Sequence, residues 1–310
     1  MKPVRTEQRN PRSRGLDRKS TLGILRALNR EDTRVALAVR RELPKIARAV
    51  DAIEKALGSG GRLFYIGAGT SGRLAVLDAA ECPPTFGTPP RMVQAITAGG
   101  ARALRHASEG AEDSAAGGAR DLRRADLTSK DVVVGLAASG TTPYVLGALA
   151  FAKRRGAVTV GVTANPRSPL ARAARIGIAP DTGPEAISGS TRLKAGTAQK
   201  LVLNLLSTAA MVRLGRVYEN WMVHVALTNQ KLRRRGVRIL QEAAGVSAST
   251  AEHAVRQAGN DLAAALVMLK TGVDAGNARK LLAATSGNVR QALAAARKLP
   301  KKNIERDQRG

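Results

Sequence analysis

The sequence predicts an α/β protein with a five-stranded parallel sheet, followed by a small all-helical domain. From residue 62 onwards, short β-prone runs alternate with segments that are long enough for the crossover helices of a parallel sheet. After Arg233-Arg234-Arg235-Gly236, which we expect to be a break, only helical patterns follow. The expected strands are Leu63–Ile66, Met92–Ile96, Val132–Leu136, Val158–Val162 and Ile176–Ile178.

Helices are expected before, between and after these strands. Ser20-Thr21 is a helix-start signal in the Arg-rich N-terminal arm and predicts one short helix there. Apolar residues at helical spacing predict a second helix over 46–57, directly before the first strand. Two further helices are expected over about 197–214 and over 223–232.

The length of the chain predicts more than one domain. At 310 residues it exceeds the usual single domain of about 100–200 residues. We expect an N-terminal arm and helix over 1–43 and a catalytic domain over 44–232. A small helical domain over 237–298 and a basic tail over 299–310 are expected to follow.

The charge of the chain is strongly positive, with 51 Lys and Arg against 24 Asp and Glu and a formal net charge of +27. Basic residues can bind phosphates of nucleic acids. Here, however, they are spread along both termini and many helix faces, and aromatic residues for base stacking make up only 2%. We therefore do not expect nucleic-acid binding; a positive field would equally steer a small anionic substrate.

Cysteine content and hydropathy predict a cytoplasmic protein. The single Cys82 cannot form an intramolecular disulfide, and with three histidines it makes a poor set of metal ligands. The basic N-terminus is followed by no apolar stretch of the kind found in signal peptides or membrane spans. We expect a reducing compartment, no metal and no membrane association.

A glycine-rich segment, Gly67–Arg73, follows the first expected strand and matches the G-x-G-x-x-G pattern of dinucleotide-binding proteins. Those proteins place an acidic residue at the end of the next strand, but here that strand runs into Ile96-Thr97-Ala98-Gly99-Gly100. Thr70 and Ser71 instead lie at a helix N-terminus, where an anion can bind. The alternative is a tight turn with an ordinary cap.

Two further hydroxyl-rich loops support an anion-binding site. Ser139, Gly140, Thr141 and Thr142 follow the third expected strand and precede Pro143, a good first residue of a helix. Loops at the carboxyl ends of neighbouring parallel strands can bind one ligand together. The loop over 188–194 contains Ser190 and adds two cations, Arg192 and Lys194, which would neutralise a dianion. The alternative for this loop is an ordinary helix cap with solvated charges.

Two glutamates are candidate catalytic groups. Glu81 lies at the end of the helix after the first loop, where Pro83 and Pro84 are expected to stop that helix. Glu112 lies in an acidic cluster after the second strand. Two carboxylates beside a sugar-phosphate pocket can divide the roles of acid and base. The alternative for each is a solvated acid at a helix end.

Six strings of the sequence resemble the N-acetylmuramic acid 6-phosphate etherases. They occur in the same order, and the match covers most of the chain. They are Thr6–Pro11 (TEQRNP), Gly67–Leu74 (GAGTSGRL), Asp78–Thr85 (DAAECPPT), Glu109–Ser114 (EGAEDS), Ala138–Tyr144 (ASGTTPY) and Ser190–Lys200 (STRLKAGTAQK). Several such strings at consistent spacing are far more specific than one glycine pattern.

The resemblance implies a sugar isomerase (SIS) domain, a flavodoxin-like sandwich that binds phosphosugars without a cofactor and is usually dimeric. It also implies a C-terminal domain similar to ubiquitin-associated (UBA) helical bundles. The family converts N-acetylmuramic acid 6-phosphate and water into N-acetylglucosamine 6-phosphate and D-lactate, during recycling of peptidoglycan sugars.

The resemblance also implies roles for individual residues. Glu81 corresponds to the proton donor for the departing lactate, and Glu112 to the second essential acid, to which we assign the role of base. Substrate contacts are implied for Thr70, Ser71, Ser139, Gly140, Thr141, Thr142, Ser190 and Lys194. Ala137 stands where many SIS domains have a serine, so one phosphate contact would have to come from Lys194 or Arg192.

Two other functions are compatible with the same loops. A phosphosugar sensor, as in glucokinase regulatory proteins, would bind the ligand and a protein partner and release no lactate. An aldose–ketose phosphosugar isomerase would use a similar glutamate base and yield a ketose. The presence of both Glu81 and Glu112 favours the etherase.

Overall fold

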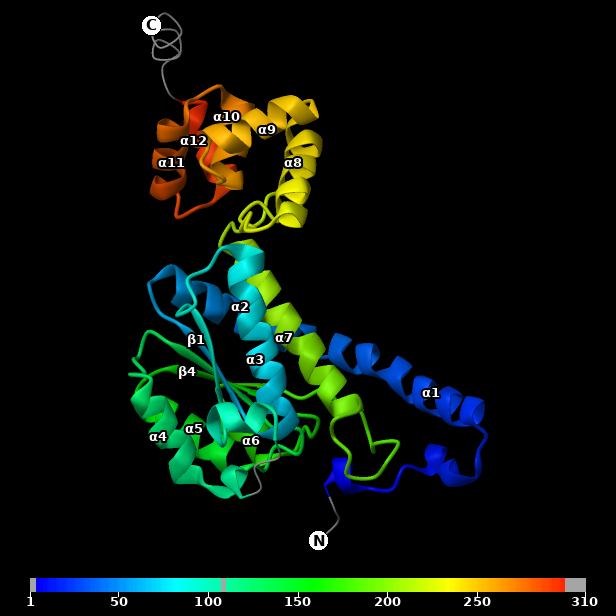
Figure 1. The fold of residues 1–310 in the computed structure, drawn as a ribbon. Coiled ribbons are helices and arrows are strands. Elements are labelled where there is room, and N and C mark those ends of the chain that lie inside the picture. Colours follow the sequence, from blue (N-terminus) through cyan, green and yellow to red (C-terminus); the bar gives the residue numbers. More distant parts are fainter. Residues whose placement is uncertain (1–3, 107–109, 299–310) are drawn as a thin grey trace, which may run out of the picture. The chain divides into compact units, whose positions relative to one another are not determined.

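The computed structural model describes residues 4–106 and 110–298 (Figure 1). Glu109 and the basic tail expected over 299–310 lie outside the described residues. The chain divides into two compact units, the first formed by residues 1–80 and 90–210 and the second by residues 81–89 and 211–310. The domain boundaries given above stay predictions.

The first unit is built on a five-stranded, fully parallel sheet. Its strands are Leu63–Gly67 (β1), Val93–Thr97 (β2), Val132–Leu136 (β3), Val158–Val162 (β4) and Ile176–Ile178 (β5). The order β2-β1-β3-β4-β5 is that of flavodoxin-like folds, so the predicted fold class is confirmed. Every residue of β1 and β3 is buried, as expected for parallel strands covered on both faces.

Helices cover both faces of this sheet and make a three-layer sandwich (Figure 1). One face carries Ala115–Arg124 (α4), Pro143–Arg154 (α5) and Pro169–Ala173 (α6). The other carries Leu43–Gly58 (α2), Gly69–Phe86 (α3) and Lys194–Arg213 (α7). Between sheet and helices lies an apolar core that includes Phe64, Val133, Val145 and Leu149.

The N-terminal arm is more structured than the sequence predicts. Three 3₁₀ turns, Arg5–Glu7 (η1), Pro11–Ser13 (η2) and Leu16–Arg18 (η3), precede a long helix, Thr21–Arg40 (α1). The predicted start of this helix is confirmed, because the Ser20 side chain accepts a hydrogen bond from the Gly23 N–H.

Two more 3₁₀ turns, Gly100–Leu104 (η4) and Ala111–Asp113 (η5), follow β2.

The expectation that Pro83 and Pro84 stop the helix after the first loop is wrong. Helix α3 continues through both prolines to Phe86. Each proline removes one backbone hydrogen bond, but both lie in the last turns, where the Gly87 N–H still donates to the Pro83 carbonyl (3.0 Å). Glu81 is therefore an exposed residue within a helix and not a residue at its end.

The second unit is helical. Its helices are Gln230–Ala244 (α8), Ala248–Gln257 (α9), Leu262–Thr271 (α10), Ala275–Ala284 (α11) and Val289–Ala296 (α12). Helix α10 is buried from Leu262 to Val267 and lies at the centre of the apolar core of this unit. The Gly-Asn pair at 287–288 directly precedes α12, and the pair at 259–260 is separated from α10 by the N-cap residue Asp261.

Two predictions for this part of the chain are wrong. Residues 223–229 are irregular instead of helical, and α8 begins only after Asn229, whose side chain accepts from the Leu232 N–H. The expected break at 233–236 lies inside α8. Gly236 lies inside this helix, and a Cβ there would lie 2.8 Å from a methyl carbon of Leu227. Within the described residues, no helix has the length and hydrophobicity of a membrane span.

Candidate active site

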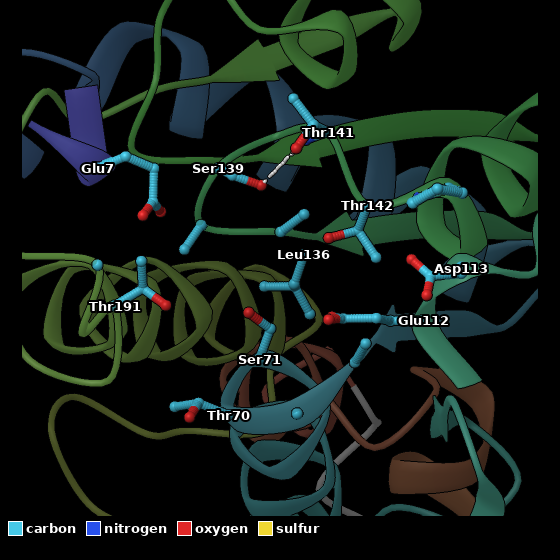
Figure 2. Close-up of a pocket in the computed structure, with 16 residues that line it drawn as sticks. Glu7, Thr70, Ser71, Glu112, Asp113, Leu136, Ser139, Thr141, Thr142 and Thr191 are labelled. Atoms are coloured by element: carbon cyan, nitrogen blue, oxygen red, sulfur yellow. Dashed lines mark hydrogen bonds between the residues drawn. The ribbon is translucent and has the colours of Figure 1, made fainter. Parts of the chain in front are cut away.

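A cavity of about 360 Å³ lies at the carboxyl ends of β1 and β3, within the first unit (Figure 2). This is the edge at which ligands bind in open α/β sheets. Two of its walls are the loops that the sequence singles out. The described residues lining it are Glu7, Ala68, Gly69, Thr70, Ser71, Glu112, Asp113, Leu136, Ala137, Ala138, Ser139, Thr141, Thr142, Pro143, Gly189 and Thr191.

The loop between β3 and α5 presents three hydroxyl groups to the cavity. The Ser139 and Thr141 hydroxyls form a 2.8 Å hydrogen bond, and the Thr141 N–H donates to Ser139 Oγ. Thr142 occupies the N-cap position of α5 without a side-chain capping bond, and its hydroxyl points into the cavity (Figure 2). The loop therefore offers hydroxyl donors to a ligand in the cavity.

Gly140 does not line the cavity but makes the turn that presents its neighbours. It has φ +73°, and a Cβ there would lie 2.3 Å from Ser168 Oγ and 2.7 Å from Thr163 Oγ1. Any side chain would therefore meet both backbone strain and a steric clash. The substrate contact predicted for Gly140 stays a prediction, because Gly140 is not among the described residues that line the cavity.

Gly140→Ala is expected to lower the free energy of unfolding by about 3 kcal/mol, from backbone strain plus overpacking. Gly183→Ala is the matched control, because Gly183 has a similar φ of +68° but no atom within 4 Å of the added Cβ. The control should lose only about 1 kcal/mol. Urea unfolding compares the two variants, and equal losses would contradict the proposed clash.

The loop between β1 and α3 brings a helix N-terminus to the cavity. Gly69, Thr70 and Ser71 form the first turn of α3, whose N–H groups have no partner within the helix. Ser71 is 7% exposed, and its hydroxyl donates to Gln199 Oε1 on α7 (2.8 Å). Gln199 thus fixes the Ser71 side chain, a role that the sequence did not reveal although Gln199 lies in the string 190–200.

Three carboxylates line the cavity, and none of the described lining residues is Lys or Arg. Glu112 and Asp113 come from η5, next to the Gly110 turn, and the Glu112 carboxylate points inwards (Figure 2). Glu7 reaches the cavity from the N-terminal arm. A phosphate here would be bound by hydroxyls and by the N-termini of α3 and α5.

The third predicted loop lies beside the cavity but does not present its cations to it. Gly189 and Thr191 line the cavity, whereas Ser190, Arg192 and Lys194 are not among the lining residues. The Lys194 ammonium is fully buried and donates to Glu31 Oε2 and to the Pro184 carbonyl, both at 2.6 Å. The cavity lining therefore gives no support to the phosphate contact expected of Lys194 or Arg192.

Glu31, on α1, holds the N-terminal arm and the start of α7 together. Its buried carboxylate accepts hydrogen bonds from Arg12 and Asn10 of the arm and from Lys194 of α7. The bond from Arg12, with those from Lys194 and Asn10, outweighs desolvation and lowers the pKa of Glu31 to about 2. The folded state thus favours the ionised Glu31 carboxylate. The stability that its ionisation contributes is complete above pH 4.5 and is lost as the pH falls towards 2.

Glu31→Gln is expected to lower the free energy of unfolding at pH 7 by about 3 kcal/mol, because it removes the carboxylate that pairs with the buried Lys194 ammonium. On acidification, the free energy of unfolding should also fall less in the variant than in the wild type. Asp32→Asn, an exposed change of equal charge on the same helix, is the control. Urea unfolding between pH 3 and pH 7 measures both effects, and parallel curves for the wild type and Glu31→Gln would contradict them.

The structure does not place Glu81 at this cavity. Glu81 belongs to the second compact unit, whereas the residues that line the cavity belong to the first. It is exposed and is not among the described residues that line the cavity of its own chain. Of the two predicted catalytic glutamates, Glu112 is among the described lining residues and Glu81 is not.

Comparisons with known proteins find a family model and solved structures that are similar to this chain. Residues 45–153 match the family model of the glucokinase regulatory protein N-terminal SIS domain. A phosphoheptose isomerase structure from Francisella tularensis has a TM-score of 0.46 at 14% identity, covering 62% of this chain and 98% of that chain.

Two relatives are similar over nearly their whole length. The N-acetylmuramic acid 6-phosphate etherase of Enterobacter sp. (strain 638) is 54% identical over 288 residues, which are 93% of this chain and 97% of the relative. That of Yersinia pestis (strain Pestoides F) is 55% identical, with 93% and 98% covered. The chain belongs to the N-acetylmuramic acid 6-phosphate etherase family.

Proposed function

We propose that this enzyme cleaves the D-lactyl ether of N-acetylmuramic acid 6-phosphate and forms N-acetylglucosamine 6-phosphate and D-lactate. The observation that carries the proposal is the identity of 54–55% to etherases of that name over 93% of the chain. The cavity supports it, because hydroxyls and two helix N-termini suit a phosphate and a carboxylate can act as a base.

The proposed reaction is an elimination followed by addition of water. In the open-chain sugar, the C1 aldehyde acidifies the C2 proton, which Glu112 removes. The electron pair forms a C2–C3 double bond as the C3–oxygen bond breaks, and Glu81 protonates the departing lactate. Water then adds its oxygen to C3 of the unsaturated aldehyde, and C2 regains a proton. The roles of Glu81 and Glu112 rest on the family resemblance.

The phosphate is proposed to lie against the first turn of α3 and the loop before α5. Thr70, Ser139, Thr141 and Thr142 supply hydroxyls there, and the helix N-termini supply N–H groups and a favourable dipole. Ser71, held by Gln199, completes this wall. Ser190 is not among the described lining residues, and its predicted substrate contact stays a prediction.

A D-lactate assay coupled to D-lactate dehydrogenase tests the proposal, with the sugar product identified by mass spectrometry. We expect one D-lactate for each N-acetylglucosamine 6-phosphate formed. The match to a regulatory SIS domain favours a sensor as the second candidate. Binding of the phosphosugar without lactate release would favour that sensor, and formation of a ketose phosphate would favour an isomerase.

The proposal includes a homodimer in the cytoplasm that takes part in recycling of peptidoglycan sugars. Exposed leucines support self-association, since Leu22 and Leu25 on α1 are 54% and 56% exposed and Leu77 on α3 is 48% exposed. The lone Cys82 is compatible with a reducing compartment. Sedimentation equilibrium of the purified protein tests the dimer, and a monomer at micromolar concentration would contradict it.

A further inference from the structure

The cavity contains a carboxylate that the proposed reaction does not use. Glu7, at the end of η1, points into the cavity from the side opposite Glu112 (Figure 2). Within the described residues no cation pairs with Glu7, and its one side-chain hydrogen bond is a long contact of 3.5 Å from the Thr6 hydroxyl. Its acceptor capacity is therefore available to a ligand.

The backbone around Glu7 is fastened to the wall of the cavity. The Thr6 carbonyl accepts from the Gly189 N–H (3.2 Å), and the Ser188 hydroxyl donates to the Glu7 carbonyl (3.1 Å). Gly189 has φ +77°, and a Cβ there would lie 3.0 Å from Glu7 Oε2. The wall thus leaves room for this carboxylate where another residue would crowd it.

The arm is also anchored on both sides of Glu7. Before it, Arg5 forms a 2.8 Å ion pair with Asp181. After it, the buried Asn10 donates to Glu31 Oε2 (2.8 Å), and Arg12 pairs with the same carboxylate. These contacts fix the path of the arm, so the position of Glu7 at the cavity follows from the fold.

The charge of Glu7 decides which part of a ligand it can contact. A carboxylate repels phosphate and lactate groups but accepts hydrogen bonds from neutral donors. The phosphate site proposed at the N-termini of α3 and α5 leaves the uncharged part of the sugar for the Glu7 side. The available donors there are the sugar hydroxyls and the acetamido N–H.

We propose that Glu7 is a further substrate-binding residue, which accepts a hydrogen bond from an uncharged donor of the amino sugar and orients the sugar towards Glu112. This inference rests on the proposed function for the identity of the sugar. It makes the N-terminal arm part of the active site, and it explains why the arm is tied to the loop over 181–191.

The test compares Glu7→Gln with Asp17→Asn, which removes the same charge from an exposed position of the arm that does not line this cavity. Loss of a hydrogen bond to a charged acceptor should lower kcat/KM for lactate release about 10- to 100-fold in Glu7→Gln. Asp17→Asn should stay within about twofold of the wild type, and both variants should keep the wild-type unfolding midpoint.

Binding measurements separate this inference from the proposed function. In calorimetry, Glu7→Gln should bind N-acetylglucosamine 6-phosphate about 10- to 100-fold more weakly than Asp17→Asn does. Inorganic phosphate, used as a competitor of that ligand, should bind both variants equally. Equal affinities of the two variants for the sugar phosphate would overturn the role of Glu7. A wild type that binds it but releases no lactate would overturn the proposed function alone.

Discussion

Glu112→Gln is expected to lower kcat for lactate release by about 10²- to 10⁴-fold, with a much smaller change in KM. The amide has nearly the shape of the carboxylate but cannot accept the C2 proton. Glu112 is exposed at the cavity and has no described ion pair, so its replacement should leave the free energy of unfolding almost unchanged.

Isotope exchange identifies the role that is lost in this variant. If Glu112 is the base, Glu112→Gln should neither release lactate nor exchange the C2 proton of N-acetylmuramic acid 6-phosphate for deuterium in deuterated water. Exchange at the wild-type rate in this variant would show that another group removes the proton. Lactate release within tenfold of the wild type would contradict any catalytic role of Glu112.

Glu81→Gln is expected to lower lactate release by a similar factor, about 10²- to 10⁴-fold, for a different reason. Lactate is a poor leaving group unless its oxygen is protonated, and the amide cannot supply that proton. The base is still present, so the C2 proton of the recovered substrate should exchange with solvent in this variant. Glu81 is exposed on α3, and the substitution should not alter unfolding.

A substrate whose leaving group needs no proton provides the control for Glu81. With fluoride in place of lactate at C3, Glu81→Gln should eliminate fluoride at close to the wild-type rate, whereas Glu112→Gln should remain inactive. Slow fluoride release by Glu81→Gln would contradict the role of general acid.

Mixed dimers test where Glu81 acts, since it does not line the cavity of its own chain. A dimer of one Glu81→Gln and one Glu112→Gln subunit keeps one complete pair of glutamates only if Glu81 serves the site of the partner. Recovery of about half the wild-type activity in such dimers would show this arrangement, and no recovery would show that both acids act within one chain.

The sheet and its loops could be predicted from the sequence because their signals are local. Runs of β-branched residues mark buried parallel strands, and the observed strands differ from the expected ones by one residue at most. Once these strands are predicted, the positions of the hydroxyl-bearing loops after β1 and β3 are predicted as well. Thr70, Ser71, Ser139, Thr141, Thr142 and Glu112 accordingly meet at one cavity.

The remaining features depend on contacts between residues far apart in the sequence. Lys194 looks like a phosphate ligand in its loop, but Glu31 lies 163 positions earlier and binds its ammonium. Glu7 reaches the cavity only because the arm binds the loop over 181–191. Gly236 looks like a helix break in the sequence, but it is a buried residue within α8. No short-range pattern reveals these contacts.

The most direct test of the account is the conversion of N-acetylmuramic acid 6-phosphate in deuterated water, with the sugar product followed by NMR at C2. Elimination and hydration predict D-lactate together with N-acetylglucosamine 6-phosphate that carries deuterium at C2. Lactate release with the C2 proton retained would contradict the proposed mechanism, because the ether would then be cleaved without removal of that proton.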